Sequence, residues 1–171
     1  FAMHGLYVAS DEDEAKYPDF LRKAEKRLAK AQRKLSQKQK ESHNREKQRL
    51  RVAILHEKVA NQRRDFLHKK ARYLADRYDV IGIEDISVKA MAKRKKGGKF
   101  SFGKSVADNG WNMFTNMLEY KLAGQGNKLI KIDKWYPSSQ LCHVCGYQNH
   151  ETKDLSVREW DCPKCGSHPN R

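Results

Sequence analysis

The sequence lacks any apolar run long enough to cross a bilayer, and no signal peptide opens it. These absences disfavour a secreted or membrane-embedded protein and indicate a reducing, cytoplasmic compartment. The sequence also lacks an initiator methionine. Its opening residues, Phe1 to His4, are those expected inside a longer chain or at an engineered N-terminus.

Acidic residues are scarce relative to basic ones. The 171-residue chain has 21 Asp and Glu against 36 Lys and Arg, so its formal net charge is +15. An excess of this size favours a polyanionic partner, with nucleic acid as the first choice and an anionic membrane surface as the second. The length suits one domain plus a small module.

Cysteines are also few, and they occur in two tight pairs. Each pair has two residues between its members, and sixteen residues separate the pairs. This spacing is typical of a structural zinc site, in which a glycine after each pair lets the backbone turn tightly around the metal. A disulfide pair or a redox dithiol is the alternative. The predicted zinc ligands are Cys142, Cys145, Cys162 and Cys165.

Three histidines lie near these cysteines and could substitute as ligands: His143, His150 and His168. Four thiolates already complete a tetrahedron, however. With no open coordination position, the zinc is expected to be structural and not catalytic.

Residues 20–78 consist mostly of helix-forming types, interrupted by a polar patch at 41–44. Apolar residues recur every three or four positions, which predicts two antiparallel helices spanning about 19–78, the second one longer. The other helix faces are rich in Lys and Arg, so both plain solvation and a nucleic-acid contact remain open. The predicted seams are Leu21, Ala24, Leu28, Ala31 and Leu35 in the first helix, and Val52, Leu55, Val59 and Phe66 in the second, with a second row at Ala53, Ala60, Leu67 and Leu74.

A strand–helix–strand pattern follows. Residues 80–84 form a short apolar run typical of a strand buried on both faces. A helix with buried Trp111 and Phe114 is expected next, and then a strand at 128–133. This order predicts a βαβ unit with a parallel strand pair, hence an α/β fold in which the strand at 80–84 is central. One more short strand is expected at 5–10, before an acidic turn.

Carboxylates end both strands of this pattern. Two-metal phosphodiester hydrolysis uses clustered carboxylates, usually at strand ends, to hold ions about 3.5–4 Å apart. Glu84 is placed as such a Mg²⁺ ligand, next to a basic loop. Asp85 points to the other face if the strand continues, and Asp133 is a weaker candidate. An exposed Glu at a strand end is more often only solvated, so both interpretations of Glu84 stand.

The loop at 98–105 matches the phosphate-binding pattern GxxxxGKS. A true P-loop follows a hydrophobic strand and opens a helix, whereas this one follows a basic run and precedes helix-breaking residues. This context disfavours an NTP site, and no small-molecule substrate is expected. It indicates a flexible segment in contact with phosphate backbone, with candidate contacts at Lys93, Arg94, Lys95, Lys96, Lys99 and Lys104.

Four segments resemble the TnpB family, whose members are encoded by prokaryotic insertion sequences and are related to type V CRISPR nucleases. Residues 83–91 (IEDISVKAM) are similar to the family's middle motif, and residues 61–69 (NQRRDFLHK) to the helix before it. Residues 136–146 (YPSSQLCHVCG) and 155–166 (LSVREWDCPKCG) are similar to the entry and exit of its zinc ribbon. The resemblance covers nearly the whole chain in the family's order.

The resemblance implies a RuvC-like, RNase H-type core at 1–136 and a zinc ribbon at 137–171. It implies RNA-guided, Mg²⁺-dependent cleavage of DNA by three carboxylates, with guide RNA and target DNA as partners, in a prokaryotic cytoplasm at the nucleoid. Glu84 corresponds to the second carboxylate. The first is expected upstream of Phe1 and the third just after Asn170-Arg171, so the active site is expected to be incomplete in this chain.

Two other hypotheses remain. One is a nuclease-inactive RNA-guided DNA-binding protein of the same descent, although the intact Glu84 favours the nuclease. The other is a stand-alone module of zinc ribbon and coiled coil, which the apolar strand ending in Glu84 disfavours.

Overall fold

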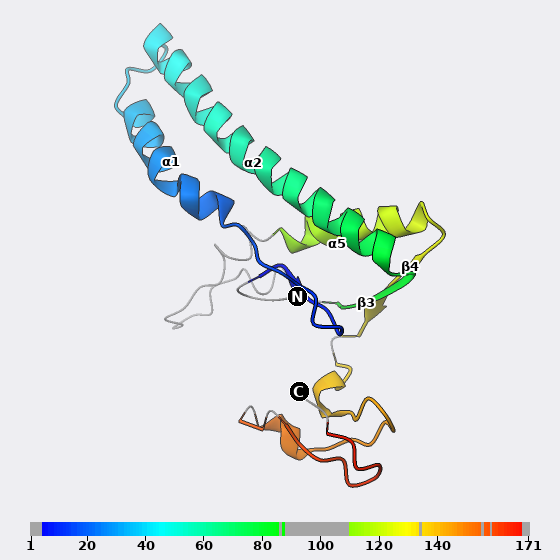
Figure 1. Ribbon diagram of the computed structural model, residues 1–171. Helices are drawn as coiled ribbons and strands as arrows, with labels where there is room; N and C mark the ends of the chain where they lie inside the picture. Colours follow the sequence, from blue (N-terminus) through cyan, green and yellow to red (C-terminus); the bar gives the residue numbers. More distant parts are fainter. Residues whose placement is uncertain are drawn as a thin grey trace. The chain divides into compact units, whose positions relative to one another are not determined.

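A computed structural model describes residues 5–85, 87, 110–133, 135–154, 156–157 and 159–168. The chain divides into two compact units, residues 1–131 and 132–171. Figure 1 shows the ribbon with colours that follow the residue number. The first unit contains the helices and the paired strands, and the second contains the four cysteines. Among the described residues, no helix combines the length and the apolar character of a membrane-spanning segment.

The first unit is dominated by a helical hairpin, formed by α1 (Phe20–Ser36) and α2 (His43–Arg77). Both predicted helices are present, and the second is the longer one (Figure 1). Helix α2 starts within the predicted polar patch. The Ser42 hydroxyl caps it by accepting a hydrogen bond from the Arg45 backbone N–H at 3.2 Å. Such a cap satisfies one of the backbone donors that every helix N-terminus leaves unpaired.

The seam between α1 and α2 is mainly apolar and contains one buried amide. Leu28 and Ala31 of α1 are buried, as is Val59 of α2. Gln48 is also buried, and its Nε2 donates to the Ala31 carbonyl oxygen at 3.0 Å. This bond satisfies the amide donor inside the seam, where an unpaired polar group would be costly.

The second apolar row of α2 holds for only half of its predicted length. Leu67 and Leu74 are buried, but Ala53 and Ala60 are exposed. The reason is a change of neighbour along the helix. The N-terminal part of α2 packs against α1, whereas the C-terminal part packs against α5 (Trp111–Ala123), which buries a different stripe.

The main core lies between α2 and α5. Trp111 and Phe114 are 2% and 1% exposed, as the apolar pattern predicts, and they pack with Leu67, Leu74 and Leu118. Gly110, directly before α5, has a φ of +64°, and a Cβ there would lie 3.1 Å from Leu67 Cδ1. Glycine therefore lets the start of α5 approach α2 closely.

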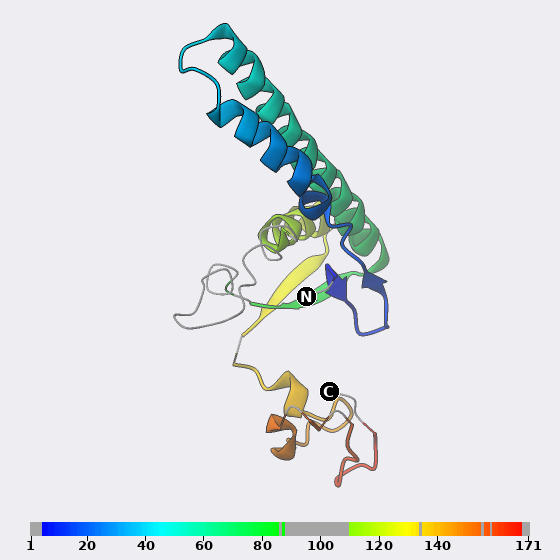
Figure 2. The ribbon, with the colours of Figure 1, turned by 90° about the vertical axis from the view of Figure 1, so that its left-hand side faces the viewer.

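Strands β3 (Val80–Glu84) and β4 (Lys128–Ile132) pair with each other, as predicted. The Lys128 N–H donates to the Asp79 carbonyl oxygen at 3.0 Å, so the two strands start side by side. They consequently run in the same direction, which Figure 2 also shows. This is the parallel pair expected of a strand–helix–strand unit.

The expectation that β3 is buried on both faces is wrong for the described residues. Val80 is 56% exposed, and Ile130 of β4 is 51% exposed, whereas Ile81 and Leu129 pack against the core. The helices cover one face of the pair, and no described element covers the other. Apolar side chains that alternate along a strand point to opposite faces, so half of them remain open.

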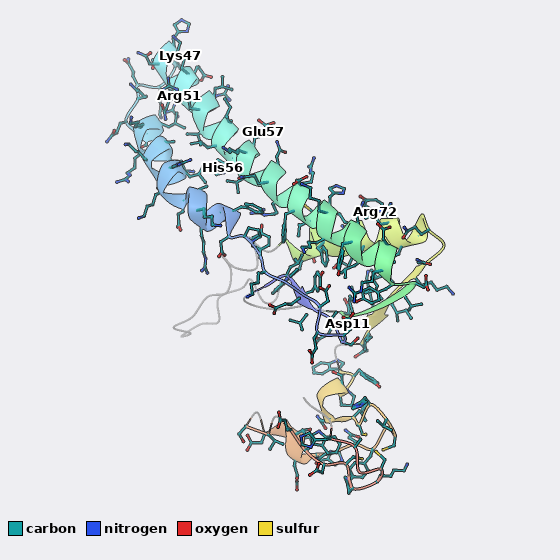
Figure 3. All side chains as sticks on the ribbon, viewed as in Figure 1. Asp11, Lys47, Arg51, His56, Glu57 and Arg72 are labelled. Atoms are coloured by element: carbon teal, nitrogen blue, oxygen red, sulfur yellow. The ribbon has the colours of Figure 1, made fainter. Side chains whose placement is uncertain are left out.

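A short hairpin completes the first unit. Strand β1 (Tyr7–Val8), within the strand predicted at 5–10, pairs antiparallel with β2 (Glu14–Ala15), which the sequence pattern missed inside its acidic turn. Asp11, in the turn between the strands, accepts hydrogen bonds from Arg77 Nη2 and the Tyr78 hydroxyl. Figure 3 shows it at the end of the unit where α2 finishes. These bonds connect the β1–β2 hairpin to the C-terminal end of α2.

Replacing Phe114 with Ala should lower the free energy of unfolding by about 3–5 kcal/mol, because it removes a fully buried ring from the core. The ring stacks on Tyr7 at 5.9 Å between centroids. Urea unfolding followed by far-UV circular dichroism measures the change. Met113→Ala, at the neighbouring position where the side chain is 37% exposed, is the matched control. A larger loss for Met113→Ala than for Phe114→Ala would contradict the proposed core.

Candidate metal centre and the Glu84 strand end

Two backbone turns with the same hydrogen bonds carry the cysteines of the second unit. In each turn, the N–H of the first cysteine donates at 2.8 Å to a carbonyl five residues later. The glycine after the second cysteine donates back to the carbonyl of the first, at 2.9 Å in one turn and 2.8 Å in the other. The bonded pairs are Cys142 with Tyr147 and Gly146, and Cys162 with Ser167 and Gly166.

Glycine is required in both turns for its backbone conformation. Gly146 has a φ of +71° and Gly166 a φ of +70°, in the left-handed region that other residues rarely adopt. A Cβ at either position would meet no atom within 4 Å. The constraint is therefore torsional and not steric, as the CxxCG pattern predicts.

The two turns bring all four cysteine sulfurs together. The Sγ atoms lie within 4.8 Å of one another, with 3.6 Å between Cys142 and Cys165 and 3.5 Å between Cys145 and Cys162. These separations far exceed a disulfide bond of about 2.05 Å, and all four cysteines are free. Sulfurs at about 2.3 Å from a tetrahedral zinc would lie roughly 3.8 Å apart. The donor set therefore fits a four-thiolate metal site.

A small apolar cluster supports the site. Cys142 and Cys162 are each 2% exposed, and they pack with the buried ring of Trp160 and with Val157. Cys145 is half-buried, whereas Cys165 is exposed. One side of the sulfur cluster is thus shielded from water and the other is open to it.

Ser167 contributes to the site although the sequence analysis did not single it out. Its hydroxyl lies 3.1 Å from the Sγ atoms of both Cys142 and Cys165. Hydrogen bonding to this hydroxyl stabilises a thiolate. It is the largest of several causes that together lower the pKa of Cys142 to about 6, and it also lowers the pKa of Cys165. The signal that could have revealed it is the small hydroxyl residue directly after the second CxxCG.

The nearby histidines do not join the cluster. His168 Nδ1 lies 2.8 Å from Asp161 Oδ1, and this hydrogen bond raises the pKa of the imidazole. His143 and His150 are exposed. Within the described ranges, the four cysteines form the only group of three or more residues that could hold a metal ion.

Glu84 is the last residue of β3, and its side chain is exposed. It lines one end of a groove of about 270 Å³ in the first unit. Residues 7–10 form one wall of this groove and β3 the other, while Leu74, Phe114 and Leu118 contribute apolar lining. In the described part of the chain, β3 pairs with β4 along one edge and with no strand along the other.

The other carboxylate candidates have different surroundings. Asp85, the residue after β3, is exposed. Asp133 Oδ1 accepts a hydrogen bond from the Trp135 backbone N–H at 2.7 Å, which indicates a role in the local turn. The candidate phosphate-contacting residues at 93–96, 99 and 104 lie outside the described residues.

Comparison with known protein families gives two matches along this chain. Residues 2–95 match the family OrfB_IS605, described as "Probable transposase". This match covers more than half of the chain and includes the hairpin, β3 and Glu84. The chain belongs to the TnpB family of insertion-sequence proteins. Residues 111–171 match a second family, "Cas12f1-like, TNB domain".

Curated relatives of this TnpB-family chain carry consistent names. It is 39% identical over 166 residues to "Putative RNA-guided DNA endonuclease" of Streptomyces pristinaespiralis, covering 97% of this chain and 40% of the relative. It is 34% identical over 167 residues to "Putative RNA-guided DNA endonuclease InsQ" of Escherichia coli K12, covering 92% and 41%. The chain thus spans about two fifths of the length of these relatives.

Among solved structures, the chain is similar to one from "Cryo-EM structure of the Cas12f1-sgRNA-target DNA complex". The TM-score is 0.48 at 21% sequence identity, over 92% of this chain and 40% of that one.

Replacing Ser167 with Ala should weaken zinc binding by about 10–100-fold, because the change removes the hydroxyl beside two sulfurs. Competition against a chromophoric chelator measures the affinity. Ser156→Ala is the matched control, since the Ser156 hydroxyl bonds Asp154 instead. Equal affinities for the two variants would show that Ser167 plays no part in metal binding.

Proposed function

We propose that this chain is the nuclease-domain portion of a transposon-associated, RNA-guided DNA endonuclease with a RuvC-like core and an inserted zinc ribbon. Family membership and the names of the curated relatives support the proposal. The position of Glu84, at the end of a parallel strand beside a groove, is the observation that carries it. The boundary between core and ribbon at 136/137 stays a prediction.

In this proposal the four cysteines bind one structural zinc ion. Four thiolates fill the coordination sphere, so no position remains for a water or a substrate. The zinc would join two turns that also meet at a small apolar cluster around Trp160 and at the Ser167 hydroxyl. The metal site would thereby stabilise the fold of the second unit.

Glu84 is proposed as one of the carboxylates that hold catalytic Mg²⁺. Mg²⁺ prefers oxygen ligands and loses its water shell reluctantly, so a two-metal site needs several carboxylates. Glu84 belongs to no group of three potential ligands in the described ranges. Following the family resemblance, the proposal draws the other acids from residues outside this chain, and the chain alone should not cut DNA.

The groove beside Glu84 could accommodate the strand that carries the first of these acids. One edge of β3 has no described strand partner, and the neighbouring groove has an apolar lining. A further strand pairing with that edge would satisfy its backbone groups. We infer that this is the strand that the family resemblance puts upstream of Phe1. Its carboxylate would then approach Glu84, while the third acid would follow Asn170-Arg171.

The partners in this proposal are a guide RNA and the target DNA. The net charge of +15 supports polyanionic partners, and the relatives' names specify RNA guidance and DNA cleavage. Neither a membrane nor a small-molecule substrate is part of the proposal. The proposed location is the prokaryotic cytoplasm, at the nucleoid.

In the full-length protein, Glu84→Gln should abolish guided DNA cleavage and leave guided DNA binding intact. The substitution removes a metal-binding charge but no contact to the DNA backbone. Cleavage of a plasmid target in Mg²⁺ and a gel-shift assay measure the two activities. Asp85→Asn is the matched control, because it removes the neighbouring exposed carboxylate.

Full cleavage by the Glu84→Gln protein would show that the assignment of Glu84 is wrong. If the unmodified full-length protein bound its guided target but never cut it, the alternative of a nuclease-inactive RNA-guided DNA-binding protein would replace the proposal.

A further inference from the structure

Helix α1 has an unusual charge distribution for a surface helix. Its 17 residues include a single acid, Glu25, and seven basic residues. All seven are exposed: Arg22, Lys23, Lys26, Arg27, Lys30, Arg33 and Lys34.

The seven cations lie together on one exposed side of α1, where Lys23 and Arg27 also line a pocket with Leu55 and Val59 of α2. At 100° per residue, they occupy a continuous arc of about 140°. Leu28 and Ala31, which are buried in the seam, lie outside this arc. Glu25 lies outside this arc. We call the arc the α1 basic face.

Helix α2 differs from α1, because several of its eleven Lys and Arg residues form ion pairs with carboxylates. Arg49 binds Glu46 at 2.9 Å, Lys69 binds Asp65 at 2.8 Å, and Arg72 binds Asp76 at 2.8 Å. Figure 3 labels Arg72 in the C-terminal part of α2. Six cations of the α1 basic face have no ion pair with a carboxylate of the described residues: Lys23, Lys26, Arg27, Lys30, Arg33 and Lys34.

Unpaired cations at this density repel one another. Lys26, Lys30 and Lys34 follow each other at intervals of four residues, and like charges at that spacing destabilise a helix. A ligand that supplies a row of negative charges would remove this repulsion. Lys23 and Lys34 are separated by about 16 Å along the helix axis, at 1.5 Å per residue. One strand of a duplex carries about five phosphates over that length.

We propose that the α1 basic face binds the sugar–phosphate backbone of a nucleic acid. The inference rests on the proposed function only in expecting a nucleic-acid partner, and it assigns that contact to a particular surface. Phosphates of RNA and DNA share the chemistry that this face recognises. The contact is electrostatic and independent of base sequence.

The test measures binding of the 171-residue chain to a 20-bp RNA hairpin and to a DNA duplex of the same sequence. Fluorescence anisotropy over a range of salt concentrations, without added Mg²⁺, separates binding from cleavage. The test variant carries Lys26→Gln, Lys30→Gln and Arg33→Gln. The control variant carries Arg49→Gln, Lys69→Gln and Arg72→Gln, which remove the same net charge from ion-paired positions of α2.

The test variant should bind at least tenfold more weakly at 0.1 M salt. The negative slope of its log K against log salt should become shallower by up to about 2–3. The control variant should stay within threefold of the unmodified chain. A charge-retaining variant with Lys26→Arg, Lys30→Arg and Arg33→Lys should bind normally. A loss restricted to the RNA hairpin, or to the DNA duplex, would assign the face to that nucleic acid.

Equal weakening by the test and control variants would overturn the proposal, because net charge alone would then explain binding. Circular dichroism at 222 nm checks that the α1–α2 helical hairpin of each variant folds. If the glutamine variant lost helix, three alanines at the same positions would repeat the test with the best helix-forming residue. Because binding is read without Mg²⁺, its outcome is independent of whether Glu84 is catalytic.

Discussion

The first unit depends on α2 packing against two different neighbours along its length. Near its middle it buries Val59 against α1, and further on it buries Leu67 and Leu74 in the core with α5. Strand β3 begins three residues after α2 ends, so the α2–α5 core determines where the strand runs. The position of Glu84 and of the adjoining groove therefore follows from this helix packing.

The second unit is organised differently, because its described residues form no comparable apolar core. Among them, the buried ones are Thr152, Trp160 and the two cysteines Cys142 and Cys162. A cluster of this size buries too little apolar surface to stabilise a fold on its own, and small modules commonly compensate with a metal or disulfides. The repeated CxxCG turns bring the four sulfurs within 4.8 Å of one another, so the segment has a donor set that fits one metal ion.

Several features could be predicted because they depend on local sequence periods. The spacing of apolar residues such as Leu28 and Ala31 predicts the helices, and Trp111 and Phe114 predict the buried face of α5. The full burial predicted for β3 failed because an apolar run does not reveal how many layers cover a strand. Strand β2 was missed because two paired residues are too short to leave a pattern.

By itself, the sequence determined the paired helices, the parallel strand unit and the cysteine turns, since each follows from the geometry of neighbouring residues along the chain. Only the tertiary structure decided that the Ser167 hydroxyl reaches the sulfurs of both Cys142 and Cys165, which lie 25 and 2 residues away. It alone decided that Asp11 joins Arg77 and Tyr78, across 66 and 67 residues. Such contacts have no sequence period, because they form only after packing brings distant segments together.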